Sequence, residues 1–277
     1  MIQTLINNVM SKQDGNRQAI ETLNMDRICL SQDYPTATFG HDRAELCIYV
    51  LLGDIAVHVE WGWGVCEENM AALPLSVPRR TVQEPMVCIL RMPAFTAGPK
   101  ITINLGSYSA DVLCVWNSSP EAKDASNIPP SQRYAIQTTC YNHHVGTGTH
   151  ERWVREVPTP PGYTIHCGET LNIPGGWSSW PSHATPEEVA RHAEHEELFF
   201  VITPGYGLMH CDGLYPDGTR APQVQRVANG DAIRTPLGAH EIVFSPGDWG
   251  WYFWAYRSFL QKQYNKWATD GVKTYVK

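Results

Sequence analysis

The stretch that decides the fold runs from residue 230 to residue 240 and reads Gly230-Asp231-Ala232-Ile233-Arg234-Thr235-Pro236-Leu237-Gly238-Ala239-His240. It contains a Gly-Asp turn, a short strand, a Pro-x-Gly turn and a histidine, in that order. Short strands between such turns are typical of antiparallel β proteins.

The same pattern extends outward over most of the chain. Segments rich in β-branched and aromatic residues are separated by Gly- and Pro-containing turns such as Gly53-Asp54 and Asn229-Gly230. By residue number these segments are 46–52, 55–61, 86–92, 100–105 and 111–116 in the first half, and 162–173, 196–203, 206–211, 224–227, 232–235, 241–244 and 249–256 in the second. We therefore predict an all-β protein built from antiparallel sandwiches or barrels.

A polar, proline-containing segment from Ser118 to Ser131 separates the two series of strands and is interpreted as a linker. We expect two domains, residues 1–120 and residues 121–277. One short helix is predicted inside the second domain, because Thr185-Pro186-Glu187-Glu188 forms a capping box that starts a helix through about Ala193.

Composition excludes several classes of protein. The 277 residues carry 21 basic and 28 acidic side chains, a net charge of −7, and no basic block for binding nucleic acid. No apolar run is long enough to span a membrane, and no secretory signal is visible. The eight cysteines lie mostly in apolar stretches without a Cys-x-x-Cys pair, which indicates reduced thiols and a cytoplasmic protein.

Three motifs between residues 145 and 256 carry a resemblance to a known family. They are Gly146-Thr147-Gly148-Thr149-His150-Glu151-Arg152-Trp153-Val154, Trp177-Ser178-Ser179-Trp180-Pro181-Ser182-His183 and Glu196-Glu197-Leu198-Phe199-Phe200. With the stretch that ends at His240, they resemble the two motifs of the cupin superfamily. More narrowly, they are similar to the bicupin family of 5-deoxyglucuronate isomerase and related uronate ketol-isomerases.

The resemblance implies two cupin-like antiparallel β-barrels, of which the first is structural and the second holds a divalent metal. Carried over residue by residue, the metal ligands are His183, Glu197 and His240, and the ion is Zn, Mn, Fe or Ni. The implied activity is the aldose–ketose isomerisation of a small acidic sugar such as 5-deoxyglucuronate, within inositol catabolism. No catalytic base is assigned.

One position departs from the family pattern. The family has His-x-His where this chain has His183-Ala184-Thr185, and Thr185 already serves as the predicted helix cap. His195 lies two residues before Glu197 and shares its face if both are on a strand. We therefore propose His183, His195, Glu197 and His240 as a rearranged ligand set. The alternative for His195 is an exposed residue in an acidic stretch.

Three residues are candidates for contacting the substrate. Arg152 suits a carboxylate because a guanidinium can bond both carboxylate oxygens at once, and the alternative is a salt bridge at the end of the barrel. Trp177 and Trp180 flank the first metal motif and are predicted to form walls of the pocket. Ordinary core packing is the alternative for both.

Two other functions remain open from sequence. A cupin without its metal would act as a ligand-binding or oligomeric interaction protein, and the Thr185 substitution favours that interpretation. An iron-dependent cupin dioxygenase would keep the metal and change the reaction. In each case we expect a small-molecule ligand, a homo-oligomer, and no nucleic-acid or membrane partner.

Overall fold

The computed structural model describes fourteen ranges of the chain. They are residues 2–4, 8–9, 23–40, 44–61, 64–71, 89–92, 100–106, 108–118, 135–137, 141–159, 163–183, 197–211, 222–235 and 240–257. The chain divides into two compact units. The first holds residues 1–5, 22–140 and 157–165, and the second holds residues 6–21, 141–156 and 166–277.

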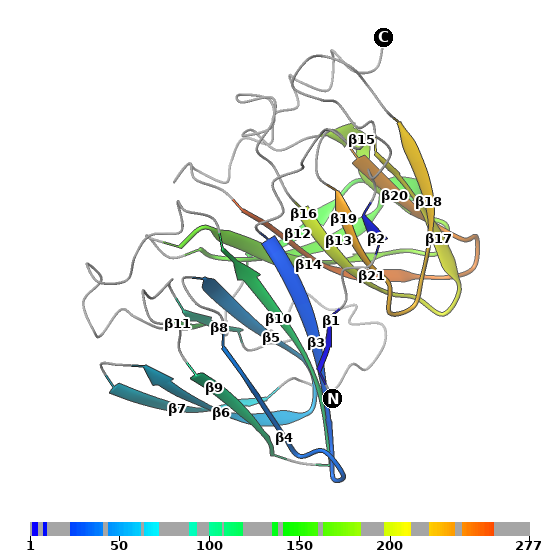
Figure 1. The fold of residues 1–277 in the computed structure, drawn as a ribbon. Helices are drawn as coiled ribbons and strands as arrows, with labels where there is room; N and C mark the ends of the chain where they lie inside the picture. The colour runs from blue at the N-terminus through cyan, green and yellow to red at the C-terminus, as the bar shows by residue number, and fades with distance from the viewer. Residues whose placement is uncertain are drawn as a thin grey trace. The chain divides into compact units, whose positions relative to one another are not determined.

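The first unit is built from two sheets (Figure 1). One has six strands in the order β1 (Ile2–Thr4), β3 (Leu23–Ser31), β10 (Ser109–Asn117), β5 (Glu45–Leu52), β8 (Ile89–Met92), β11 (Ala135–Gln137). The other has four strands in the order β4 (Thr36–Phe39), β9 (Lys100–Leu105), β6 (Asp54–Trp61), β7 (Gly64–Ala71).

The second unit also has two sheets. One has seven strands in the order β12 (Tyr141–Val145), β13 (Arg152–Val157), β14 (Ile165–Asn172), β21 (Gly250–Arg257), β16 (Glu197–Ile202), β19 (Ala232–Thr235), β2 (Asn8–Val9). The other has four strands in the order β15 (Trp177–His183), β20 (His240–Phe244), β17 (Tyr206–Cys211), β18 (Gln223–Ala228). A single 3-10 turn, η3 (Gly148–His150), is the only helical element in the ranges that the structure describes.

Strand composition explains strand position. β5 and β21 are almost entirely buried runs of aliphatic and aromatic residues, and both lie inside their sheets. β18 alternates between exposed and half-buried residues along most of its length, and it forms the edge of its sheet. Buried strands carry apolar side chains on both faces, whereas an edge strand with one wet face alternates.

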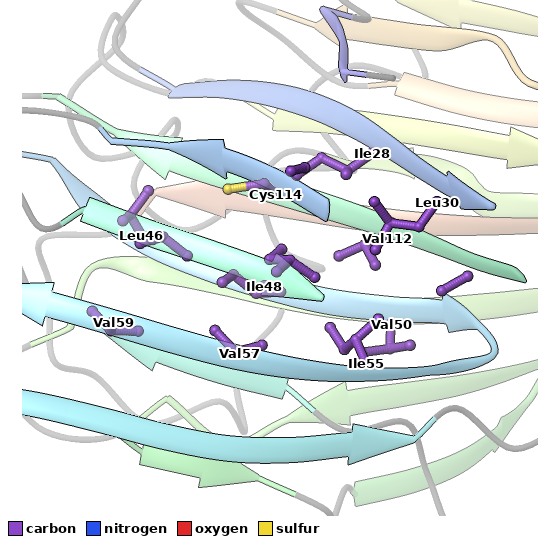
Figure 2. Close-up of a cluster of buried hydrophobic side chains, with 14 residues drawn as sticks. Ile28, Leu30, Leu46, Ile48, Val50, Ile55, Val57, Val59, Val112 and Cys114 are labelled. Atoms are coloured by element: carbon purple, nitrogen blue, oxygen red, sulfur yellow. The ribbon is translucent and has the colours of Figure 1, made fainter. Parts of the chain in front are cut away.

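Each unit has its own core between its two sheets. In the first unit, aliphatic side chains from β3, β5 and β10 face those from β6 and β9, as Figure 2 shows. In the second unit the core is richer in aromatic residues, with Phe199, Phe244, Tyr252, Trp254 and Tyr256 among its members. Burial of apolar surface between the sheets stabilises each unit.

The turn between β5 and β6 depends on a glycine, as the Gly53-Asp54 pair predicts. Gly53 has a φ of +79°, and a Cβ built on it would lie 2.0 Å from the carbonyl oxygen of Ser109. Only glycine fits this left-handed, crowded position.

These observations confirm the predicted all-β class and correct two details of it. The sheets of each unit do not close into barrels within the described ranges. The units also differ from the expected single division at residue 120. β2, near the N-terminus, pairs in parallel with β19 of the second unit, whereas residues 157–165 belong to the first unit. The helix expected from Thr185 to Ala193 and most of the linker lie outside the described residues.

Two further predictions concern membrane-spanning segments and the state of the cysteines. No helix in the described part of the chain is long and apolar enough to cross a membrane. The five cysteines whose side chains are described form no disulfide with one another, and Cys47, Cys114, Cys167 and Cys211 are buried.

A buried carboxylate fixes the segment before β14 to the first unit. Glu45, at the start of β5, accepts hydrogen bonds from the backbone N–H and the hydroxyl of Thr164, both at 2.6 Å, and from the backbone N–H of Ile165 at 2.8 Å. The Nδ2 of Asn117 donates to the same Thr164 hydroxyl at 2.8 Å. All four residues are buried, so these bonds replace the water that the carboxylate loses.

We predict that Glu45→Ala lowers the free energy of unfolding by about 3 to 5 kcal/mol, because it leaves buried donors without an acceptor. Urea unfolding followed by tryptophan fluorescence measures this loss. Thr36→Ala is the control, since it removes an exposed side-chain bond to Asn104 and should cost less than about 1 kcal/mol. Equal losses for the two variants would contradict the role assigned to Glu45.

Candidate functional site

Two of the predicted metal ligands lie together inside the second unit. Glu197 is the first residue of β16 and His240 is the first residue of β20, so each comes from a different sheet. The Nε2 of His240 lies 3.3 Å from the Oε2 of Glu197. The two residues are only 5% and 7% exposed. A buried imidazole and a buried carboxylate thus converge from strands that are 43 residues apart in the chain.

The third predicted ligand lies next to this pair in the sheet. His183 is the last residue of β15, and its backbone is the register partner of His240. The side chains of His183 and Trp180 lie outside the described residues, as does all of His195. The structure therefore brings the backbone of His183 to the Glu197–His240 pair, and His195 stays a prediction.

An aromatic cluster connects the pair to the core. The ring of Phe199 meets the ring of His240 edge to face at 5.3 Å, and it meets Tyr252 in the same way at 5.6 Å. Phe199 lies two residues after Glu197 on β16, hence on the same face. The Glu197–His240 pair is thus held against a packed aromatic layer, which limits the movement of the imidazole.

The phenol of Tyr252 joins the two sheets beneath this layer. Its oxygen lies 2.5 Å from the hydroxyl oxygen of Ser178 on β15. Burial raises the pKa of Tyr252, while hydrogen bonds to Ser178 and Thr170 and the positive charge of Arg152 oppose that rise, and the charge of Glu197 adds to it. The phenol therefore stays protonated at neutral pH.

Of the predicted substrate-binding residues, Arg152 and Trp177 lie in different surroundings. Arg152 is half-buried on β13 and lies two residues before Val154, which packs against the aromatic core, so the two residues share a face of the strand. The positive charge of Arg152 opposes the rise that burial causes in the pKa of Tyr252. Trp177 pairs with Val243 and alternates with the inward-pointing Ser178. Its indole is therefore directed to the opposite face of β15, which leaves its predicted role as a pocket wall without structural support.

A second interior carboxyl group was not found from sequence. Glu156 lies on β13 on the same face as Val154, which packs against the aromatic core. Burial, and to a lesser degree the charge of Cys167, raises the pKa of Glu156 to about 7. The neighbouring strand β14 contributes His166, whose ring stacks on Tyr256 at 5.0 Å. Tyr256 is in turn the register partner of Glu197. The only signal in the sequence was the alternation of Arg152, Val154 and Glu156.

The donor atoms fit a divalent metal ion. Two ligand atoms at about 2.1 Å from a tetrahedral ion lie about 3.4 Å apart, close to the observed 3.3 Å. Imidazole nitrogen with carboxylate oxygen suits Zn, Mn, Fe and Ni. Within the residues whose side chains are described, no group of three potential ligands occurs. The side chains of the predicted ligands His183 and His195 lie outside that part of the chain, so their role stays a prediction.

Comparison with known proteins decides the family. Residues 110–270, more than half of the chain, match the KduI/IolB family. The chain belongs to this family. KduI/IolB proteins are generally isomerases, which supports an enzymatic role for this chain.

Solved structures extend the likeness to both units of this KduI/IolB protein. An IolB-like protein from Salmonella typhimurium LT2 is 16% identical, with a TM-score of 0.69 and 98% of each chain covered. Two structures of oxalate decarboxylase from Bacillus subtilis are each 12% identical, with TM-scores of 0.51 and 0.50, and the match covers 86% of this chain and 69% of theirs. These similarities establish the cupin-like fold. No curated protein matches the chain at a significant level.

We predict that Glu156 makes the stability of the protein depend on pH. Its raised pKa means that the folded state binds a proton more tightly than the unfolded state. The stabilisation is therefore complete below about pH 4.5 and is lost as pH rises through about 7. The loss from this group amounts to about 3 kcal/mol at most. Urea unfolding between pH 5 and pH 8 should show a decline that Glu156→Gln lacks.

The control for this prediction is Glu60→Gln in the first unit, whose side chain is half-exposed. It should keep the decline of the wild-type protein. Parallel curves for the wild-type protein and Glu156→Gln would contradict the assignment.

Proposed function

We propose that this protein is a metal-dependent aldose–ketose isomerase that acts on a small acidic sugar such as 5-deoxyglucuronate. One observation carries the proposal: a member of the KduI/IolB family brings a buried histidine and a buried glutamate within 3.3 Å of each other. A carboxylate oxygen and an imidazole nitrogen that approach each other in the interior of a unit form a donor pair of the kind that holds a divalent ion.

The proposed ligands are His183, His195, Glu197 and His240, and the ion is Zn, Mn, Fe or Ni. A similar fold supports a metal here, since a solved structure of Bacillus subtilis oxalate decarboxylase concerns its Mn(II) centres. Glu197 offers a hard oxygen donor and His240 a nitrogen donor. The register that sets the backbone of His183 opposite His240 supports His183 as a further ligand.

The residues around the site suggest how the sugar is oriented, with its carbonyl group at the metal and its carboxylate at Arg152. His240 and Glu197 would hold the divalent ion, which would supply electrophilic stabilisation of the sugar carbonyl oxygen. Arg152 binds the carboxylate at the far end of the sugar through its guanidinium, and its charge already reaches the interior at Tyr252. The aromatic layer under Glu197 and His240 excludes water from the reacting carbons.

Cellular context follows from the same proposal. A sugar isomerase of this kind operates on soluble metabolites in the cytoplasm, within inositol catabolism, and we propose that it forms a homo-oligomer. The burial of four of the described cysteines in apolar surroundings agrees with a reducing compartment.

The ligand set predicts which substitutions remove the metal. Purified Glu197→Ala and His240→Ala should each lose most of the bound divalent metal, because each removes a donor from an ion that has few. His183→Ala should lose it equally, and His195→Ala should lose it only if His195 replaces the second histidine. Elemental analysis of the purified variants measures the content, and Glu241→Ala, on the opposite face of β20, is the control. Full metal content in Glu197→Ala would overturn the site.

The reaction is tested with a panel of uronates, including 5-deoxyglucuronate, on metal-loaded protein. We expect conversion between the aldose and ketose forms, and we expect Arg152→Lys to raise KM at least tenfold with a smaller effect on kcat, because lysine cannot form the paired bonds. Absence of turnover with metal restored would reject the isomerase. Oxygen uptake with iron would instead identify a dioxygenase, and a melting temperature unaffected by EDTA and added metal would identify a metal-free cupin.

A further inference from the structure

The strand β15 contains a register shift between Ser178 and His183, within the motif that ends at the predicted metal ligand His183. Trp177 and Ser178 pair with Val243 and Ile242 of β20, and pairing resumes only at His183, opposite His240. Four residues of β15, 179–182, therefore lie opposite the single residue Glu241. An unbroken ladder would place Trp180 opposite His240. Because of the shift, His183 and not Trp180 lies opposite His240.

The shift begins at a strained residue. Ser179 has a φ of 59°, and it is the only residue other than glycine with a positive φ in the described part of the chain. Such a conformation persists only where the surrounding structure enforces it. Ser179 is also buried, so its backbone is enclosed rather than exposed at a turn.

The hydrogen bond between Ser178 and Tyr252 lies immediately before this residue. Both side chains are buried, and the bond runs from the four-stranded to the seven-stranded sheet of the second unit. It holds β15 in place at the last residue before the strand leaves the ladder. Without it, the strand could return to the regular pairing, which the strain at Ser179 would favour.

The same tyrosine connects to the Glu197–His240 pair by the other route. Phe199 packs edge to face on both Tyr252 and His240, and it follows Glu197 by two residues on β16. Four strands thus form a closed circuit of contacts: Ser178 on β15, Tyr252 on β21, Phe199 on β16 and His240 on β20. The contacts return to β15 at His183, whose backbone pairs with His240 on β20.

We propose that Tyr252 and Ser178 are positioning residues for the metal site, because their hydrogen bond holds the register shift that places His183 opposite His240. Neither residue is a ligand. The inference rests on the metal site proposed above, and it goes beyond that proposal by assigning the geometry of the site to a hydroxyl pair in the core.

The test measures Mn(II) affinity and thermal stability separately. Mn(II) binding to metal-free protein is followed by the electron paramagnetic resonance signal of the free ion, for the wild-type protein, Tyr252→Phe, Ser178→Ala and the double variant. We expect each single variant to bind Mn(II) at least tenfold more weakly. The double variant should bind no more weakly than Tyr252→Phe, because Tyr252→Phe already removes the bond to Ser178, together with the bond of Tyr252 to Thr170.

Thr203→Val is the matched control. It removes another hydroxyl bond of the second unit, from Thr203 to the carbonyl oxygen of Trp249 at 2.8 Å, distant in the sheet from Glu197. It should lower the melting temperature with no change in Mn(II) affinity. Ser179→Gly should keep the affinity of the wild-type protein, because glycine adopts a positive φ without strain.

The outcomes separate the two proposals. Failure of the wild-type protein to bind Mn(II), Zn(II), Fe(II) and Ni(II) alike overturns the metal site and this inference with it. Wild-type binding together with unchanged affinity in folded Tyr252→Phe and Ser178→Ala overturns this inference alone. A tenfold loss in Thr203→Val as well would show that general destabilisation, and not the position of β15, weakens binding, and it would also overturn the inference.

Discussion

Burial of the Glu197 carboxylate beside the His240 imidazole is the constraint on which the second unit depends. Each group loses its water on folding, and that loss is costly unless an opposite charge or a shared cation compensates for it. The two residues come from different sheets, so the distance between them is set by how the sheets pack. The aromatic core between the sheets, with Phe199 and Tyr252 in contact, therefore determines the geometry of the site as well as the stability of the unit.

In the described residues, the interiors of the two units differ in polarity, and the candidate site lies in the more polar one. In the first unit the interior is aliphatic and forms a continuous apolar cluster across both sheets (Figure 2). In the second unit, interior positions carry Glu156, Thr170, Ser178 and Glu197 among the aromatic residues. Polar groups in these positions reduce stability unless they are paired, so their presence beside the Glu197–His240 pair agrees with the function proposed for that unit. The first unit instead places its buried carboxylate, Glu45, in a hydrogen-bonded role that fixes the chain.

Sequence predicted most strands that are rich in apolar residues and missed those that are not. β5 and β21 were evident because apolar or aromatic residues fill both faces. β3 was missed because Asn24, Asp26 and Arg27 interrupt its pattern, and its stability depends partly on the pairing of Arg27 with Asp111 on β10, 84 residues away. The site divides in the same way. Glu197, His240 and the place of His183 followed from motifs, whereas the Tyr252 hydroxyl acquires its partner, Ser178, only through the fold.

The motif from Trp177 to His183 illustrates what sequence shows and what it conceals. Its composition does not favour a β-strand, since it contains three serines and a proline. In the structure these residues suit a strand that must leave its ladder and return to it: Ser178 bonds across the core, Ser179 takes the left-handed turn, and Pro181 lies where no pairing with β20 is made. A proline lacks an N–H, so it is tolerated on an edge strand such as β15, and above all where the ladder is interrupted. The features that make the segment a weak strand are thus those that allow His183 to reach His240.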